Sequence, residues 1–220
     1  MSRPKISIDQ RLLEAQQAID GSLNNPDILQ AVALMGYDQP RLLAAHTLYD
    51  EVMALVATQQ REYGEQYEAS ATLQATWDAA DLAYKRTLKL CRIAFRDQTK
   101  AQNTLGLNGS RKKSLGGWIE QATTFYINLL DTPELTAALS PFGYDQEKLE
   151  GEAALVQTVA KARAAQNKER GEAQEATQLR DAKLDELDQW LADYKAIAEI
   201  ALAASPQQLE QLGWVVAYLD

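Results

Sequence analysis

Apolar side chains recur along most of the chain with the three- and four-residue spacing of amphipathic helices. The spacing is clearest in two long segments, Pro40 to Gln102 and Gln146 to Ala204, which contain no internal proline and are rich in Ala, Leu, Glu, Gln, Lys and Arg. These residues are good helix formers, and the alternating apolar and polar pattern of a β-strand does not occur in the sequence. The pattern therefore predicts an all-α protein dominated by long amphipathic helices.

The sequence resembles itself at an offset of 107 residues, without a gap. Gly36-Tyr37-Asp38-Gln39 recurs as Gly143-Tyr144-Asp145-Gln146, and roughly a quarter of the positions from Arg11 to Leu107 are identical in the second segment, against a few per cent expected by chance. This similarity predicts an internal duplication. We expect a single all-α domain over residues 1–220, made of repeat 1 (residues 11–107), a connector containing Gly and Ser (residues 108–117) and repeat 2 (residues 118–214).

Each repeat begins with short elements before its long segment. A first helix is expected near residues 9–19 and 118–130, and Pro26 or Pro133 marks the first turn of a short second helix. Gly36 and Gly143 then fit the left-handed conformation that ends a helix, and the aspartates two residues later can cap the long helix that follows. Both repeats therefore predict the same order of elements.

The long segments allow two architectures that differ at Gly64 and Gly171. If these glycines close helical hairpins, the chain forms a bundle of four antiparallel helices with short helices at the ends. If the helices continue, each repeat contains one long, kinked, coiled-coil-like helix, and the two helices cross near their glycines. Residues 61–69 and 168–176 contain one helix breaker each, and an isolated glycine costs a helix about 1 kcal/mol. Continuous helices are therefore slightly favoured, within an internally duplicated antiparallel helical bundle.

Composition narrows the range of functions. The formal charge of −9 and the pI near 4.8 argue against a general nucleic-acid-binding protein and against binding to an anionic membrane, which both need an excess of Lys and Arg on one face. The first residues lack the apolar core of a signal peptide, and no stretch approaches the roughly 18 consecutive apolar residues of a membrane-spanning helix. We expect a cytoplasmic protein that binds neither nucleic acid nor membrane; the sequence leaves its oligomeric state open.

The titratable residues do not form a known catalytic motif. The chain has one histidine, His46, and one cysteine, Cys91, so neither a di-iron site with Glu-x-x-His motifs nor a cysteine-based zinc cluster can be built. We expect His46 to be satisfied by neighbours or to face solvent, and Cys91 to be a small buried residue. These observations predict a non-enzymatic protein without a cofactor.

Glutamates near the two central glycines are the strongest candidates for a metal site. The candidates are Glu62, Glu65, Glu169 and Glu172. The pair in each repeat lies on one side of its helix, so convergence of the two segments would gather carboxylate oxygens, the ligands that Mg²⁺, Ca²⁺ and Mn²⁺ prefer. The favoured alternative is that they form solvated acidic faces paired with neighbouring Lys and Arg side chains.

The connector holds the one basic run of the sequence, Arg111-Lys112-Lys113. Three charges are too few for a nucleic-acid footprint, and no phosphate-binding motif is present. A solvated linker is the favoured interpretation, and contact with a phosphate group is the alternative.

The end of the chain and the segment after Gly171 resemble a known group of proteins. The matching stretches are Leu191 to Leu202, Ser205 to Gly213, Gly171 to Thr177, and the connector from Leu107 to Trp118. They are similar to an uncharacterised bacterial family of duplicated helical proteins. The resemblance implies a bacterial protein with the same helical architecture, and it implies no activity, cofactor or catalytic residue.

Taken with the acidic charge, the predicted helices favour a non-enzymatic interaction or scaffold protein that binds another protein through its helical surface. A first alternative is a divalent-metal-binding helical bundle that uses the paired glutamates. A second alternative is a helical carrier in which aromatic residues line a cavity for an apolar ligand.

Overall fold

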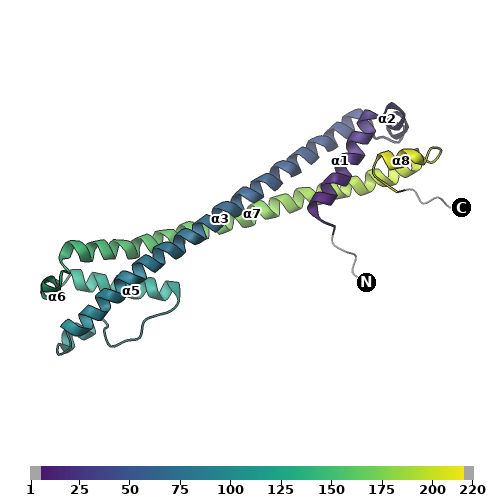
Figure 1. The fold of residues 1–220 in the computed structure, drawn as a ribbon. Helices are drawn as coiled ribbons and strands as arrows, with labels where there is room; N and C mark the ends of the chain where they lie inside the picture. The colour runs from purple at the N-terminus through teal and green to yellow at the C-terminus, as the bar shows by residue number, and fades with distance from the viewer. Residues whose placement is uncertain (1–5, 216–220) are drawn as a thin grey trace. The chain divides into compact units, whose positions relative to one another are not determined.

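The computed structural model describes residues 6–215 and confirms the all-α prediction, since no strand occurs among these residues (Figure 1). The helices are α1 (Ile8–Asn24), α2 (Pro26–Ala33), α3 (Gln39–Ala94), α4 (Thr99–Thr104), α5 (Leu115–Leu130), α6 (Pro133–Leu139), the 3₁₀ helix η1 (Ser140–Phe142), α7 (Gln146–Ala201) and α8 (Gln207–Gln211). Within the described part of the chain, no helix combines the length and the apolar character that crossing a lipid bilayer requires.

The two long segments are continuous helices, so the hairpin interpretation is wrong. Helices α3 and α7 each contain 56 residues, and Gly64 and Gly171 lie inside them. Figure 1 draws each of the two as one uninterrupted helix. A methyl group added at either glycine would meet no atom within 4 Å. Neither glycine is therefore required by packing, and each helix tolerates its glycine because the flanking residues are good helix formers.

The long helices end earlier than the apolar pattern predicts. Helix α3 stops at Ala94, and a turn leads to α4, where the expected segment continued to Gln102. The Gln102 side chain folds back and donates hydrogen bonds to the carbonyl oxygens of Phe95 (3.0 Å) and Arg96 (2.5 Å). These bonds satisfy carbonyls at the helix end, and hydrophobic periodicity carries no signal for them.

The turns before α3 and α7 have the predicted glycine conformation and aspartate caps. Gly36 and Gly143 have φ angles of 84° and 75°, in the left-handed region. Asp38 accepts a hydrogen bond from the backbone N–H of Arg41 (3.1 Å), and Asp145 accepts the equivalent bond from Lys148 (2.9 Å). Both turns are therefore stabilised by a left-handed glycine and by an aspartate that caps the following helix.

Contacts group the described residues into two compact units that do not follow the repeats. Unit 1 contains the described residues up to Glu62 and from Ala173 onward, and unit 2 contains Tyr63–Glu172. The boundary crosses α3 and α7, and the connector lies inside unit 2. Each unit therefore combines part of residues 11–107 with part of residues 118–214.

The core of unit 1 is formed by α1, α2, α8 and the adjoining parts of α3 and α7. Its largest buried cluster includes Tyr37, Leu42 and Tyr194. Tyr194 stacks on Trp190 with ring centroids 5.0 Å apart, and its hydroxyl forms a buried hydrogen bond with Ser22. The aromatic rings thus join α7 to α1 and to the turn before α3.

The core of unit 2 is formed by α4, α5, α6 and the other parts of α3 and α7. Tyr84 of α3 lies at its centre and contacts three aromatic rings of α5, with centroid distances of 6.2 Å to Trp118, 5.2 Å to Phe125 and 6.1 Å to Tyr126. This cluster holds α5 against α3 and positions the connector that precedes α5.

Candidate functional site

Two of the four predicted metal ligands lie together in unit 2. Glu65 on α3 and Glu169 on α7 bring carboxylate oxygens within 4.8 Å of one another. They belong, with Glu68, to the lining of a shallow pocket of about 270 Å³. Two carboxylates at this separation offer oxygen ligands for a hard divalent cation.

Glu62, Glu169 and Glu172 each have a basic neighbour. Glu172 accepts a hydrogen bond from the ammonium group of Lys168 at 2.8 Å, and the same group lies 3.4 Å from Glu169. The hydrogen bond to Glu172 is the main reason that the pKa of Lys168 is raised. Glu62, where the first stretch of unit 1 ends, pairs with the adjacent Arg61 at 3.2 Å. The predicted pairing of the acidic faces with Arg and Lys therefore applies to these residues.

A second site, which the sequence reasoning missed, surrounds Asp81 of α3. The Asp81 carboxylate accepts hydrogen bonds from Trp118 Nε1 (2.8 Å) and Arg111 Nη1 (2.7 Å), and it forms an ion pair with Lys85 (2.5 Å). Partial burial is the largest single influence on its pKa and raises it. The hydrogen bonds from Lys85 and Trp118, together with the charge of Arg111, outweigh that burial and lower the pKa. Asp81 is therefore an ionised anchor for the connector and α5.

The connector lies along a pocket of about 540 Å³ next to this anchor. The pocket is lined by Trp77, Asp81, Arg92, Ser110, Arg111, Lys112, Lys113 and Trp118. The backbone of the connector is fixed by Arg92, which donates to the carbonyl oxygens of Leu107 (2.9 Å) and Gly109 (3.2 Å). Lys112 and Lys113 are exposed, as the interpretation of the basic run as a solvated linker predicts, and the run also forms one wall of this pocket.

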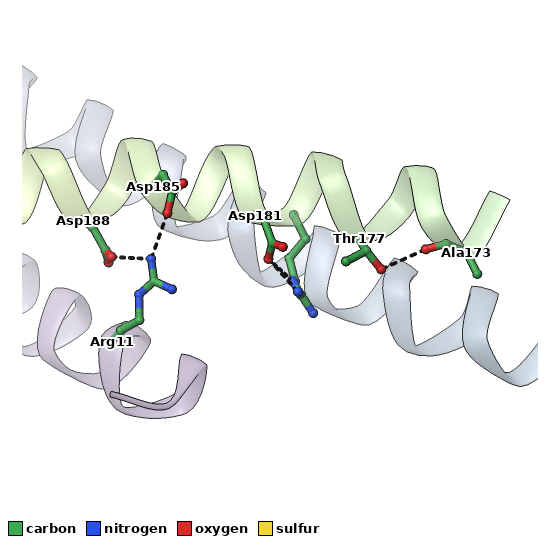
Figure 2. Close-up of polar contacts among 7 residues, drawn as sticks. Arg11, Ala173, Thr177, Asp181, Asp185 and Asp188 are labelled. Carbon is green, nitrogen blue, oxygen red and sulfur yellow. Dashed lines mark hydrogen bonds and ion pairs between the residues drawn. The ribbon is translucent and has the colours of Figure 1, made fainter. Parts of the chain in front are cut away.

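Unit 1 contains an equivalent aspartate anchor. Arg11 of α1 forms ion pairs with Asp185 (3.2 Å) and Asp188 of α7, as Figure 2 shows. The hydrogen bond to Asp188 is the largest cause of the raised pKa of Arg11. Arg11 and Trp118 are 107 residues apart, as are Asp188 and Asp81. The recurring aspartates therefore hold the first helix of one similar segment against the long helix of the other.

The same stretch of α7 carries two further local polar contacts. Arg180 pairs with Asp181 at 2.5 Å, and the Thr177 hydroxyl donates a hydrogen bond to the Ala173 carbonyl at 2.9 Å (Figure 2). Both contacts join residues of the same helix, so neither of them links α7 to another element.

Four other titratable groups are buried or lie beside a polar neighbour. Glu152 accepts hydrogen bonds from Thr87 (2.5 Å) and from Tyr126 (2.9 Å), whose pKa is raised mainly by burial. Burial also raises the pKa of the Cys91 thiol to about 12, which keeps it protonated and unreactive at neutral pH. His46 is partly exposed on α3 and lies 3.1 Å from Asp50. None of Glu152, Tyr126, Cys91 and His46 lines the pocket beside the connector.

A comparison with protein-family models, curated proteins and solved structures found no significant match to the chain. The class of the molecule is therefore defined by its fold and sites: an all-α protein with two compact units, a shallow acidic pocket and a basic, tryptophan-lined pocket.

Proposed function

We propose that this chain is a non-enzymatic interaction protein that binds a partner protein through apolar side chains in the turn before each long helix. In unit 1 this turn exposes Leu34 (83% exposed) and Met35 (46%), and in unit 2 it exposes Phe142 (55%). Met35 and Phe142 are 107 residues apart. Equivalent turns that both present large apolar side chains to solvent are the observation that carries the proposal.

The backbone on which these side chains stand is well fixed. The left-handed glycine of each turn is followed by a tyrosine that packs under a cation. The Arg41 guanidinium lies 3.8 Å from the Tyr37 ring centroid, and the Lys148 ammonium lies 3.6 Å from the Tyr144 centroid. A rigid turn loses little conformational entropy when a partner covers it, which favours binding.

The proposal includes an internally duplicated, antiparallel arrangement of the helices. In unit 1, Leu42 near the start of α3 belongs to the same cluster as Tyr194 and Ala198 near the end of α7. Val52, further along α3, clusters with Leu184 and Leu187, which come earlier in α7. This reversed order of contacts supports antiparallel pairing. A bacterial, cytoplasmic protein without affinity for nucleic acid stays our expectation from the sequence.

Capture of partners by the full-length protein tests this function. We expect the wild-type protein to recover a stoichiometric partner from a native lysate, and the Leu34→Gln, Met35→Gln, Phe142→Gln variant to lose it. Leu179→Gln is the matched control, because Leu179 is 52% exposed on α7, away from either turn. No recovered partner, or equal recovery by the triple variant, would refute the proposal.

A second candidate function is divalent-metal binding, favoured by the short separation of the Glu65 and Glu169 carboxylates. Titration calorimetry with Mn²⁺ tests it, because Mn²⁺ accepts an all-oxygen ligand set. Binding should be lost in Glu65→Gln and kept in Glu175→Gln, which removes an exposed carboxylate elsewhere on α7. No heat of binding, or equal affinity in both variants, would exclude a site at Glu65 and Glu169.

A further inference from the structure

We propose that the pocket beside the connector binds a small phosphorylated ligand with a flat ring, of the size and chemistry of a nucleoside monophosphate. Its lining includes Arg92, Arg111, Lys112 and Lys113 against the single carboxylate of Asp81, so four positive charges and one negative charge leave a net charge of +3. The whole chain carries −9. A cationic pocket on an acidic protein concentrates an anion at one place.

The cationic side chains of the pocket differ in how many of their N–H donors are already paired within the protein. Lys112 forms an ion pair with Glu120 at 2.7 Å, and Arg111 uses one guanidinium nitrogen for Asp81. Lys113 forms no ion pair or side-chain hydrogen bond with any described residue. Lys113 and the remaining N–H groups of Arg111 are therefore available to a phosphate, which accepts several hydrogen bonds at once.

The connector is held in place before any ligand arrives. Arg92 donates to the carbonyl of Leu107, just before the connector, and to that of Gly109 within it. The Gln121 side chain accepts a hydrogen bond from the Lys112 backbone N–H (2.8 Å) and donates one to the Ser110 carbonyl (3.2 Å). Because these bonds fix the backbone around Lys113, ordering the loop adds little to the entropic cost of binding.

Two tryptophans form the apolar wall of the pocket. Their ring centroids are 6.1 Å apart with an angle of 63° between the planes. Trp118 is 1% exposed and is locked by its bond to Asp81, whereas Trp77 is partly exposed, and its buried Nε1 has no hydrogen-bond partner among the described residues. Trp77 is therefore the ring on which a flat ligand would stack.

Size and chemistry together select the ligand class. About 540 Å³ falls within the range of pockets that enclose small molecules. The cations disfavour a wholly apolar ligand, and the tryptophans give a bare inorganic anion nothing to stack on. A phosphate joined to an aromatic ring system can contact the cations with its phosphate group and the tryptophans with its ring. This inference concerns a different surface from the exposed turns, so it stands or falls independently of the proposed partner binding.

Calorimetry and tryptophan fluorescence on the full-length protein test the proposal with adenosine 5′-monophosphate, adenosine and inorganic phosphate as separate probes. We expect the monophosphate to bind at least about tenfold more tightly than adenosine or inorganic phosphate. Adenosine can contact only the tryptophans, and inorganic phosphate can contact only the cations. Lys113→Gln should weaken the monophosphate by up to about fivefold, since it removes one exposed charge. Lys89→Gln, which removes an exposed cation of α3 outside the pocket, is the control and should bind like the wild type.

Trp77→Leu separates stacking from charge. It should weaken the monophosphate by about fivefold or more and leave the affinity for inorganic phosphate unchanged. If this variant is poorly folded by circular dichroism, the comparison of the three probes and Lys113→Gln still decide the question. No binding of the monophosphate at millimolar concentration, equal affinity for inorganic phosphate, or an unchanged affinity in Lys113→Gln would each overturn the proposal.

Discussion

Replacing Asp81 with alanine should destabilise unit 2, and much more than replacing the neighbouring carboxylate of Asp78. The Asp81 carboxylate holds three donors that come from the connector, from α5 and from its own helix. The most costly loss is at Trp118, because its indole N–H is buried and would have no acceptor after the substitution. The connector would also lose the contact through Arg111.

The magnitude follows from the exposure of each partner. An unsatisfied buried donor costs about 1–3 kcal/mol. Each ion pair with a partly exposed cation, Lys85 or Arg111, contributes about 0.2–1 kcal/mol. We therefore expect Asp81→Ala to lower the free energy of unfolding by about 2–4 kcal/mol. Asp78→Ala is the control: Asp78 is exposed one helical turn earlier and contacts Gln74, so its loss should cost less than about 0.5 kcal/mol.

The effect should depend on pH in a defined direction. The pKa of Asp81 is lowered in the folded protein, so its ionisation stabilises the fold above the pKa of the unfolded chain, which is about 4. This stabilisation disappears as the pH falls through the lower, folded pKa. In Asp81→Asn an amide oxygen can still accept the Trp118 bond, so the stability difference from wild type should be constant from pH 5 to 8 and should shrink below about pH 4.

Urea unfolding measures the loss, with hydrogen exchange of α5 amides to localise it. Fluorescence reports on both units because each contains two of the four tryptophans. Asp81→Ala should lower the urea midpoint and speed exchange in Leu115–Leu130, while Asp78→Ala should do neither. A loss below about 0.5 kcal/mol in Asp81→Ala, or faster exchange confined to other helices, would refute the argument that Asp81 anchors α5.

Three further predictions follow from local packing. Gly64→Ala and Gly171→Ala should each raise the free energy of unfolding in urea by about 0.5–1 kcal/mol, because both sites are open and helical, whereas Gly143→Ala should lower it by about 1 kcal/mol or more because of its positive φ. Cys91 should not react with iodoacetamide at pH 8 until the protein is unfolded, and alkylation of the native protein would contradict its burial and raised pKa. Tyr126→Phe should cost about 1 kcal/mol by removing one bond to a partly buried carboxylate, and an unchanged urea midpoint would show that this bond contributes nothing.

The local structure was largely predictable from the sequence. Helix periodicity gave the two long helices, and the turns at Gly36 and Gly143 followed from residue chemistry that acts over a few positions. The helix ends beyond Ala94 and Ala201 did not follow, because α4 and α8 are short and depend on side-chain contacts such as those of Gln102. Such contacts leave no periodic signal.

The sites were predictable only in part. The recurrence of Asp81 as Asp188 was visible, but their partners are a tryptophan in one unit and an arginine in the other, so comparing the two segments could not reveal what the aspartates contact. The basic run was visible as well. Its place along a pocket depends on contacts between the connector and α3, including the bonds from Arg92, which are distant in sequence and carry no motif.

The sequence favours continuous helices over hairpins only slightly, and the reason lies in which segments of the chain make up each unit. Unit 1 takes α1, α2 and the beginning of α3 from one similar segment and the end of α7 and α8 from the other; unit 2 takes the complementary pieces. A segment that turned back at its own glycine would bring together equivalent pieces from within itself. Equivalent contacts would then form with hairpins as with continuous helices. Domain swapping works in the same way, since protomers exchange identical elements.

This equivalence is clearest at the aspartate anchors. Asp81 holds Trp118, and Asp188 holds Arg11, so each of these aspartates anchors the first helix of the other segment. The apolar pattern, the helix caps and the recurring charges indicate which helix surfaces pack together. These features do not differ between hairpins and continuous helices. What separates the two is the conformation of a few residues around Gly64 and Gly171, where helix formation outweighs the cost of one glycine. A glycine costs a helix about 1 kcal/mol relative to alanine, and the continuity of α3 and α7 shows that this cost does not end a helix whose neighbouring residues are good helix formers.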